Sequence, residues 1–284
     1  MPGFFIPNKR MRFREETIMS KSNTTVIRAR SLTEKKYRDE YGLFRTDGVK
    51  LAAELFSRGI VPELVLLKES SKDRILERLG KDLPDCEAVV LSDAVFDRVS
   101  EEKSPEGIIC EVKHLDNHGK IATINKDAFF GWKNERLMLL ESVRDPGNLG
   151  TIIRAAAAFG TDRLVISSDC ADIYNPKTVR ASMGTLFGIS VDMTDDLALT
   201  VSILRQCGRR IFAAALDRGA ASLAGLTLES GDCFVVGNEG HGLSKAVLDA
   251  CDGKVFIPIS AGAESLNAAV AASILLWEQK RQLG

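Results

Sequence analysis

The feature of this sequence that most constrains its fold is a series of short apolar runs in the second half, separated by segments of helical length. Leu137–Leu140 consists of large apolar residues only, and Asp232–Val236 is apolar after its first position. Strands of this composition are buried on both faces, and such strands occur in parallel sheets that helices cover on each side. The sequence therefore predicts a helix-covered parallel sheet within residues 135–284.

A second, smaller α/β unit is predicted in residues 28–115. Apolar runs alternate here with amphipathic segments, which is typical of strands that alternate with helices. The expected strands are 64–67, 88–91 and 107–112, and the expected helices are 47–58, 73–79 and 92–99.

Two segments show neither the residue pattern of a strand nor that of an amphipathic helix. Residues 1–27 are basic and lack the apolar core of a secretory signal, so we expect a flexible extension that is available to RNA phosphates. Met19 offers an alternative start, which would make residues 1–18 a further extension. Residues 116–134 are polar and irregular and are predicted to be a linker.

Composition excludes several classes of protein. The formal net charge is -1, so no global basic field indicates a nucleic-acid-binding protein, although a local basic patch stays open. No apolar run approaches the roughly 20 residues that a membrane span needs. The six cysteines form no C-x-x-C pair and the three histidines lack partners at metal-ligand spacing, so we expect no metal, reduced thiols and a cytoplasmic protein.

Three polar loops that contain glycine follow predicted strands, at 144–150, 237–244 and 258–267. Ligands of parallel sheets bind outside the carboxyl ends of the strands, so these loops predict the binding site. The loop 237–244 has neither the G-x-G-x-x-G spacing of dinucleotide-binding folds nor the Gly-Lys-Ser/Thr of a phosphate-binding loop. NAD binding and nucleotide hydrolysis are therefore excluded.

Each loop taken alone allows two interpretations. Asn148 is either a helix cap or a site residue, and Glu239 is either a solvated turn residue or a hydrogen-bonding anchor. Arg154, beside an alanine run, faces either solvent or a polar site. The small residues of 258–267 form either a ligand cradle or a tightly packed turn in which Ser265 caps the next helix.

Together, the three loops resemble the motifs of the SpoU (TrmH-like) family of RNA ribose 2′-O-methyltransferases. The pattern is Asp145-Pro-x-Asn148-x-Gly150…Arg154, then Gly237-Asn-Glu239-Gly, then Ile257-Pro…Glu264-Ser-Leu-Asn267. The smaller unit resembles, more loosely, the ribosomal-protein-like substrate-binding domain of that family. The resemblance implies a parallel-sheet methyltransferase domain tied in a trefoil knot, S-adenosylmethionine as methyl donor, and a homodimer with the active site near the subunit interface.

The resemblance also implies roles for individual residues. Catalysis or active-site order is expected of Asn148, Arg154, Glu239, Ser265 and Asn267, and cofactor binding of Gly237, Ile257 and Leu266. The family mechanism makes Arg154 the base. Because an arginine keeps its proton up to a pH above about 12, we favour Arg154 as an orienting and charge-stabilising residue.

The predicted function is S-adenosylmethionine-dependent methylation of a ribose 2′-hydroxyl in structured RNA. The separate amino-terminal domain favours ribosomal RNA, with 23S ribosomal RNA as the main expectation. A transfer-RNA 2′-O-methyltransferase, a methyltransferase acting on a base or a small molecule, and a non-catalytic RNA-binding or ribosome-assembly protein are the alternatives. The candidate RNA contacts are Arg180, Lys177 and Lys50.

Overall fold

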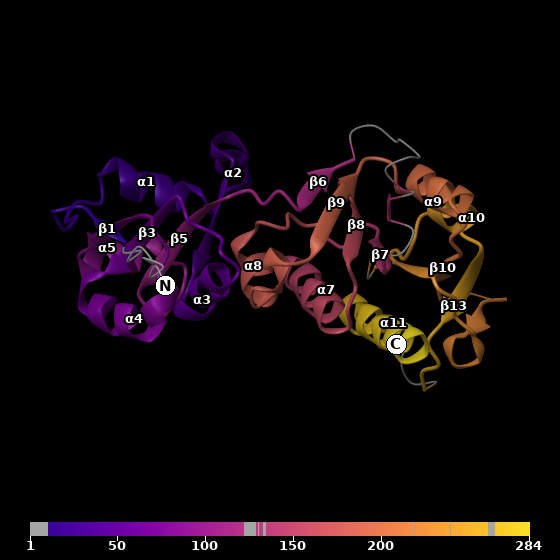
Figure 1. Cartoon of the computed structure of the whole chain (residues 1–284). Helices are drawn as coiled ribbons and strands as arrows, with labels where there is room; N and C mark the ends of the chain where they lie inside the picture. Colours follow the sequence, from indigo (N-terminus) through magenta and orange to yellow (C-terminus); the bar gives the residue numbers. More distant parts are fainter. Residues whose placement is uncertain are drawn as a thin grey trace, which may run out of the picture. The chain divides into compact units, whose positions relative to one another are not determined.

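The computed structural model describes residues 11–121, 129, 131–132, 135–217, 219–238, 240–260 and 265–284. The chain forms two compact units (Figure 1). The first contains the residues up to 115 together with 174–187, and the second contains 116–173 and 188–284.

The first unit is built on a mixed sheet with the strand order β1-β4-β3-β5-β2. Its strands are β1 (Arg12–Phe13), β2 (Leu43–Asp47), β3 (Leu64–Lys68), β4 (Glu87–Leu91) and β5 (Ile108–Lys113). Its helices are α1 (Thr24–Ser31), α2 (Lys35–Tyr41), α3 (Val49–Ser57), α4 (Lys72–Leu79), α5 (Asp93–Val99) and α8 (Pro176–Ala181), with short 3-10 helices at Glu69–Ser71, Gly80–Asp82 and Thr185–Phe187. Apolar residues of α1 and α5 pack on the sheet through side chains that alternate along β3 and β4, which makes one core layer.

The three strands predicted for this unit are confirmed, each within one residue of β3, β4 or β5. The sequence missed β2 because Arg45 interrupts its apolar pattern. The side chain of Arg45 is only 1% exposed; its Nη1 donates to the carbonyl oxygens of Ala29 and Val99, at 3.1 and 2.9 Å, and its Nη2 donates to Asp47. A charge can be buried in this edge strand because these partners satisfy it.

The prediction of a flexible extension over residues 1–27 is wrong for residues 11–27. Strand β1 pairs in parallel with β4, and Ile18 forms a further parallel bridge to Leu91. The helix α1 then begins four residues before the predicted domain boundary. Residues 1–10 lie outside the described residues.

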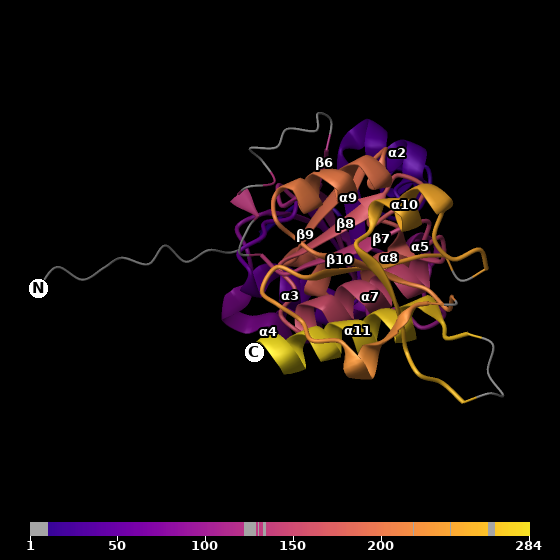
Figure 2. The same cartoon turned by 90° about the vertical axis from the view of Figure 1, so that its right-hand side faces the viewer.

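The second unit is built on a sheet with the order β11-β13-β10-β12-β7-β8-β9-β6, and all pairings of its described strands are parallel. Helices α7 and α11 lie on one face and α9 and α10 on the other (Figure 2). The strands are β6 (His118–Lys120), β7 (Leu137–Leu140), β8 (Arg163–Ser167), β9 (Ser190–Thr194), β10 (Ile211–Ala214), β11 (Ala221–Ser222), β12 (Cys233–Val236) and β13 (Gly253–Phe256). The helices are α7 (Pro146–Ala158), α9 (Leu197–Gln206), α10 (Lys245–Ala250) and α11 (Ala268–Leu283), with a 3-10 helix at Leu223–Gly225.

The predicted parallel sheet is thus confirmed, with two local differences. The apolar run before Pro258 predicts a strand over 255–259, but β13 ends at Phe256, so Ile257 lies in the loop beyond it. Within the predicted linker 116–134, β6 pairs with β9, because His118–Lys120 supplies a short extended edge beside Val191. Most of the remaining linker lies outside the described residues.

Residues 174–187 also differ from the prediction, because they pack in the first unit and not with the rest of 135–284. Tyr174 stacks between Phe44 and His114, with ring centroids 4.5 and 4.4 Å apart, and its hydroxyl accepts a hydrogen bond from the backbone N–H of Leu115. This segment therefore contributes to the core of the first unit.

The trefoil knot stays a prediction, because the path from β13 to α11 includes residues 261–264, which lie outside the described residues. Among the helices that the structure describes, none combines the length and the apolar character needed to cross a membrane.

Candidate active site

A pocket of about 430 Å³ opens at the carboxyl ends of β10, β12 and β13. Its size is in the range of roughly 300–1,000 Å³ that is typical of small-molecule sites. The three residues predicted to bind a cofactor, Gly237, Ile257 and Leu266, all line it. Most of its other lining residues are apolar, and a few, such as Asp217 and Asn238, are polar, which suits a ligand with an apolar ring system and polar edges.

One wall of this pocket is a loop that closes on itself at Gly237. The backbone groups of Asn238 and Gly242 exchange hydrogen bonds of 3.1 and 2.9 Å. A Cβ atom on Gly237 would lie 2.5 Å from the carbonyl carbon and oxygen of Gly242 and 2.7 Å from the nitrogen of Leu243. Only glycine permits so close an approach of two backbone segments.

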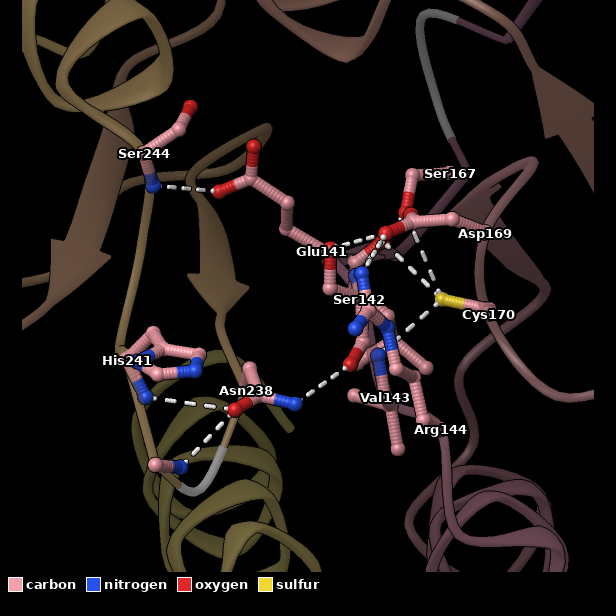
Figure 3. Close-up of polar contacts among 12 residues, drawn as sticks. Glu141, Ser142, Val143, Arg144, Ser167, Asp169, Cys170, Asn238, His241 and Ser244 are labelled. Carbon is pink, nitrogen blue, oxygen red and sulfur yellow. Dashed lines mark hydrogen bonds and ion pairs between the residues drawn. The ribbon is translucent and has the colours of Figure 1, made fainter.

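Asn238 fixes this loop and joins it to the end of β7 (Figure 3). Its Oδ1 accepts the backbone N–H groups of Gly240 and His241 at 2.8 and 3.2 Å. Its Nδ2 donates to the carbonyl oxygen of Ser142 at 2.9 Å. Asn238 was not among the predicted site residues, although an asparagine in a glycine-rich loop directly after a buried strand is a usable signal for such a turn.

Ser142 adopts a left-handed conformation with φ 54°. A non-glycine residue in this region costs on the order of 1–3 kcal/mol and persists only where its surroundings hold it. Here its N–H donates to Ser167 Oγ at 2.8 Å, its hydroxyl donates to Asp169 Oδ2 at 2.5 Å, and its carbonyl accepts from Asn238. Strained backbone of this kind is concentrated at functional sites.

Asp169 is the centre of the same cluster (Figure 3). Its carboxylate accepts the hydroxyl groups of Ser142 and Ser167 and the Nη2 of Arg144, the last at 3.0 Å. Partial burial raises the pKa of Asp169, but these hydrogen bonds outweigh that effect and lower the pKa to about 2. The adjacent thiol of Cys170 accepts the N–H of Val143 at 3.3 Å, and burial raises its pKa.

A second connection runs from Glu141 to the start of α10. Glu141 Oε2 accepts the backbone N–H of Ser244 at 2.7 Å, and Ser244 Oγ in turn accepts the N–H of Val247 and caps the helix. The segment that follows β7 is therefore bonded both to Asn238, just after β12, and to Ser244, at the start of α10. Glu141 and Asp169 were also missed from the sequence, because their partners are far away along the chain.

Two of the predicted catalytic residues meet in space. Asn267 Nδ2 donates to Asn148 Oδ1 at 3.1 Å, which joins the starts of α11 and α7. The cap of α7 is Asp145 and the cap of α11 is Asn267, so the capping interpretations of Asn148 and Ser265 are wrong. Ser265 instead lines the pocket.

The other predicted residues are placed as follows. Arg154 is exposed on α7, one turn beyond Thr151. Glu239 lies outside the described residues. The three candidate RNA contacts belong to the first unit: Lys50 and Lys177 are exposed, and Arg180 pairs with Glu102.

Residues 135–277 match the SpoU rRNA Methylase family, and residues 23–110 match the MRM3-like substrate binding domain. The chain belongs to the SpoU rRNA Methylase family. The predicted class of RNA ribose methyltransferase is thereby confirmed, as is the fold class: an α/β parallel-sheet methyltransferase domain preceded by a small substrate-binding domain.

Individual relatives match this chain over nearly its whole length. The 23S rRNA (guanosine(2553)-2′-O)-methyltransferase RlmP of Bacillus subtilis is 35% identical over 92% of this chain and 97% of its own length. The AdoMet-bound rRNA methyltransferase of Sinorhizobium meliloti has a TM-score of 0.77 at 25% identity, over 95% of this chain and 98% of that one. The AviRb methyltransferase of Streptomyces viridochromogenes in complex with AdoMet has a TM-score of 0.75 at 25% identity, over 92% and 99%.

Proposed function

We propose that this protein transfers a methyl group from S-adenosylmethionine to a ribose 2′-hydroxyl of 23S ribosomal RNA. The observation that carries the proposal is the pocket lined by Gly237, Ile257 and Leu266 at the carboxyl ends of three parallel strands. Two solved relatives are described as bound to AdoMet, and a relative of matching length acts on 23S rRNA, which supports both the donor and the substrate. Such a substrate and free thiols support a cytoplasmic location as part of the proposal.

The described residues fit this cofactor. The closed loop at Gly237 brings backbone groups to the pocket wall, while Ile257 and Leu266 supply apolar surface against which a purine can pack. When bound, S-adenosylmethionine supplies an electrophilic methyl group. The protein's task is then to bring the ribose oxygen into line with that methyl group and to assist the loss of the hydroxyl proton.

We assign this task to the predicted catalytic residues. The hydrogen bond between Asn148 and Asn267 fixes the starts of two helices beside the pocket loop that contains Ser265. Arg154, exposed on α7, is proposed to orient the ribose and to stabilise developing negative charge through its planar, positively charged guanidinium. Glu239 is proposed to order the same site, and Lys50, Lys177 and Arg180 to contact RNA.

We also propose a homodimer that forms through α7 and α11. These helices border a shallow groove of about 430 Å³ with Asn148 and Asn267 at one end. Along it, Val270 and Trp277 are 47% and 52% exposed. An apolar strip of this kind beside the catalytic pair suits a second copy of the chain, because exposed apolar patches mark interaction surfaces.

The proposal is tested by incubating the purified protein with methyl-labelled S-adenosylmethionine and either 23S ribosomal RNA or transfer RNA. We expect label in 23S ribosomal RNA, and mass spectrometry of the nucleosides should find the methyl group on ribose. Label in transfer RNA alone, or on a base, would contradict the proposed substrate or atom. If calorimetry detects no binding of S-adenosylmethionine, the protein is instead a non-catalytic RNA-binding member of its family.

A further inference from the structure

The loop between β7 and α7 contains an arginine, Arg144, that has no role in the proposed reaction. The side chain of Arg144 is 66% exposed, and its Nη2 donates to Asp169 Oδ2 at 3.0 Å (Figure 3). Among the described residues, Asp169 is the partner that the structure gives Arg144. Most of the guanidinium N–H donors are therefore available to a ligand.

The carboxylate that holds Arg144 is itself fixed. Asp169 accepts hydroxyl groups from Ser142 and Ser167 at 2.5 and 2.6 Å, and Ser142 is held in its left-handed conformation by two further hydrogen bonds. An exposed arginine is normally free to sample many rotamers, and a partner fixed in this way restricts them. A group that is oriented before its ligand arrives loses less conformational freedom on binding.

An ion pair as exposed as this one contributes little to stability, so neutralisation of Asp169 is a weak reason for the arrangement. The planar guanidinium fork matches the geometry of a phosphate group. Phosphate contacts are the usual means by which proteins fix the position of a nucleic acid without reading its sequence.

Arg144 is also close, through hydrogen bonds and along the chain, to the residues of the candidate site. Three hydrogen bonds connect it to the pocket wall: Arg144 to Asp169, Ser142 to the same carboxylate, and Asn238 to the carbonyl of Ser142. Arg144 also directly precedes Asp145, the cap of the helix that carries Asn148 and Arg154. In RNA, the phosphodiester groups flank the ribose whose hydroxyl would be methylated.

We propose that Arg144 is a substrate-positioning residue that binds an RNA phosphate next to the target ribose, with Asp169 holding its guanidinium in place. The inference rests on the proposed function, because it takes RNA as the substrate of this site. It adds a contact within the second unit, whereas the other candidate RNA contacts lie in the first.

The test compares Arg144→Ala, Arg144→Lys and Asp169→Asn with the control Arg281→Ala in the full-length protein. Arg281 is a comparable exposed arginine, 55% exposed and paired with Glu278, near the far end of α11. The measurements are the affinity for a 23S ribosomal RNA transcript at several salt concentrations, the affinity for S-adenosylmethionine, and the KM for RNA against kcat.

We expect Arg144→Ala to weaken RNA binding about tenfold and to reduce the slope of log affinity against log salt by about 0.7–0.9, the value for one lost phosphate contact. Arg144→Lys should keep most of the salt slope and lose part of the affinity, and Asp169→Asn should raise the KM for RNA while kcat changes little. Affinity for S-adenosylmethionine and all properties of Arg281→Ala should match the wild type.

An Arg144→Ala variant with the RNA affinity and salt slope of the wild type would overturn the inference. Equal weakening of S-adenosylmethionine binding would overturn it too, since it would reveal a structural role in the pocket. Failure of the proposed function is separate, because it shows in the wild-type protein, either as no methylation of RNA or as methylation of transfer RNA alone or of a base.

Discussion

At the scale of single residues, Arg154 is the side chain on which the proposed chemistry depends most. Arg154→Ala should reduce methyl transfer by at least about 100-fold, because the proposed stabilisation of charge at the ribose oxygen is lost. Since Arg154 is exposed on α7 and does not line the pocket, affinity for S-adenosylmethionine should be unchanged. Single-turnover kinetics together with calorimetry measure the two quantities, and near-normal turnover in this variant would exclude the assigned role.

Gly237 is the residue whose substitution should damage the cofactor pocket most directly. In Gly237→Ala the new Cβ would meet backbone atoms at 2.5 Å, so the closed loop has to shift. We expect the Kd for S-adenosylmethionine to rise about tenfold or more, which corresponds to ~1.4 kcal/mol.

Gly225→Ala is the matched control for this prediction, because an added Cβ there has no neighbour within 4 Å among the described residues. It should bind S-adenosylmethionine with wild-type affinity. Equal affinities for Gly237→Ala and Gly225→Ala would contradict the reading of the loop as a pocket wall.

The residues of the candidate site were predictable from sequence to different extents. Gly237, Ile257 and Leu266 follow recognisable motifs, and they line one pocket. Ser142 and Asp169 could not be found in this way, because the strained conformation and the lowered pKa arise from hydrogen bonds between segments that are far apart in the chain. A local pattern carries no information about such contacts.

At the scale of elements, the two-residue strand β1 should contribute substantially to the stability of the first unit. It covers the edge of β4 with backbone hydrogen bonds from Arg12 and Arg14 at 2.9 and 3.0 Å, and Ile18 adds one at 2.8 Å. A chain that begins at Met19 loses all three. With about 0.5–1.5 kcal/mol for each bond, the free energy of unfolding of the first unit should fall by roughly 2–4 kcal/mol.

Chemical denaturation of the two forms measures this difference, and the exposed edge of β4 should also increase aggregation. The control is a chain that begins at Met11, which keeps every hydrogen bond named above. Equal stability of the forms that begin at Met11 and Met19 would refute the structural importance of β1.

The elements that the sequence predicted best are the apolar strands of the parallel sheet, whose composition alone indicates burial on both faces. The elements that it missed are short or polar. Strand β2 contains Arg45, whose burial depends on carbonyl groups from α1 and α5, and β1 and β6 have three residues or fewer. Tertiary partners rather than local propensity determine these strands.

At the scale of the whole molecule, the proposed dimer gives a direct prediction. Trp277→Asp places a charge in the apolar strip of α7 and α11, and it should convert a dimer into a monomer and lower methyl transfer. Light scattering coupled to size-exclusion chromatography measures the mass.

Leu199→Asp is the control for the dimer, because Leu199 is 46% exposed on α9, on the other face of the sheet. This variant should remain a dimer with full activity. A wild-type protein that is a monomer at micromolar concentration, or a Trp277→Asp variant that stays dimeric, would contradict the proposed interface.

The segment 174–187 has a consequence for protein engineering. The chain passes between its two units three times, because this segment returns to the first unit before the second is complete. A catalytic fragment cut at residue 116 would therefore expose the apolar side chains of Tyr174, Val179 and Phe187, which are buried in the intact protein. In this chain, replacing the first unit therefore requires two changes made together, one in the amino-terminal part and one in residues 174–187.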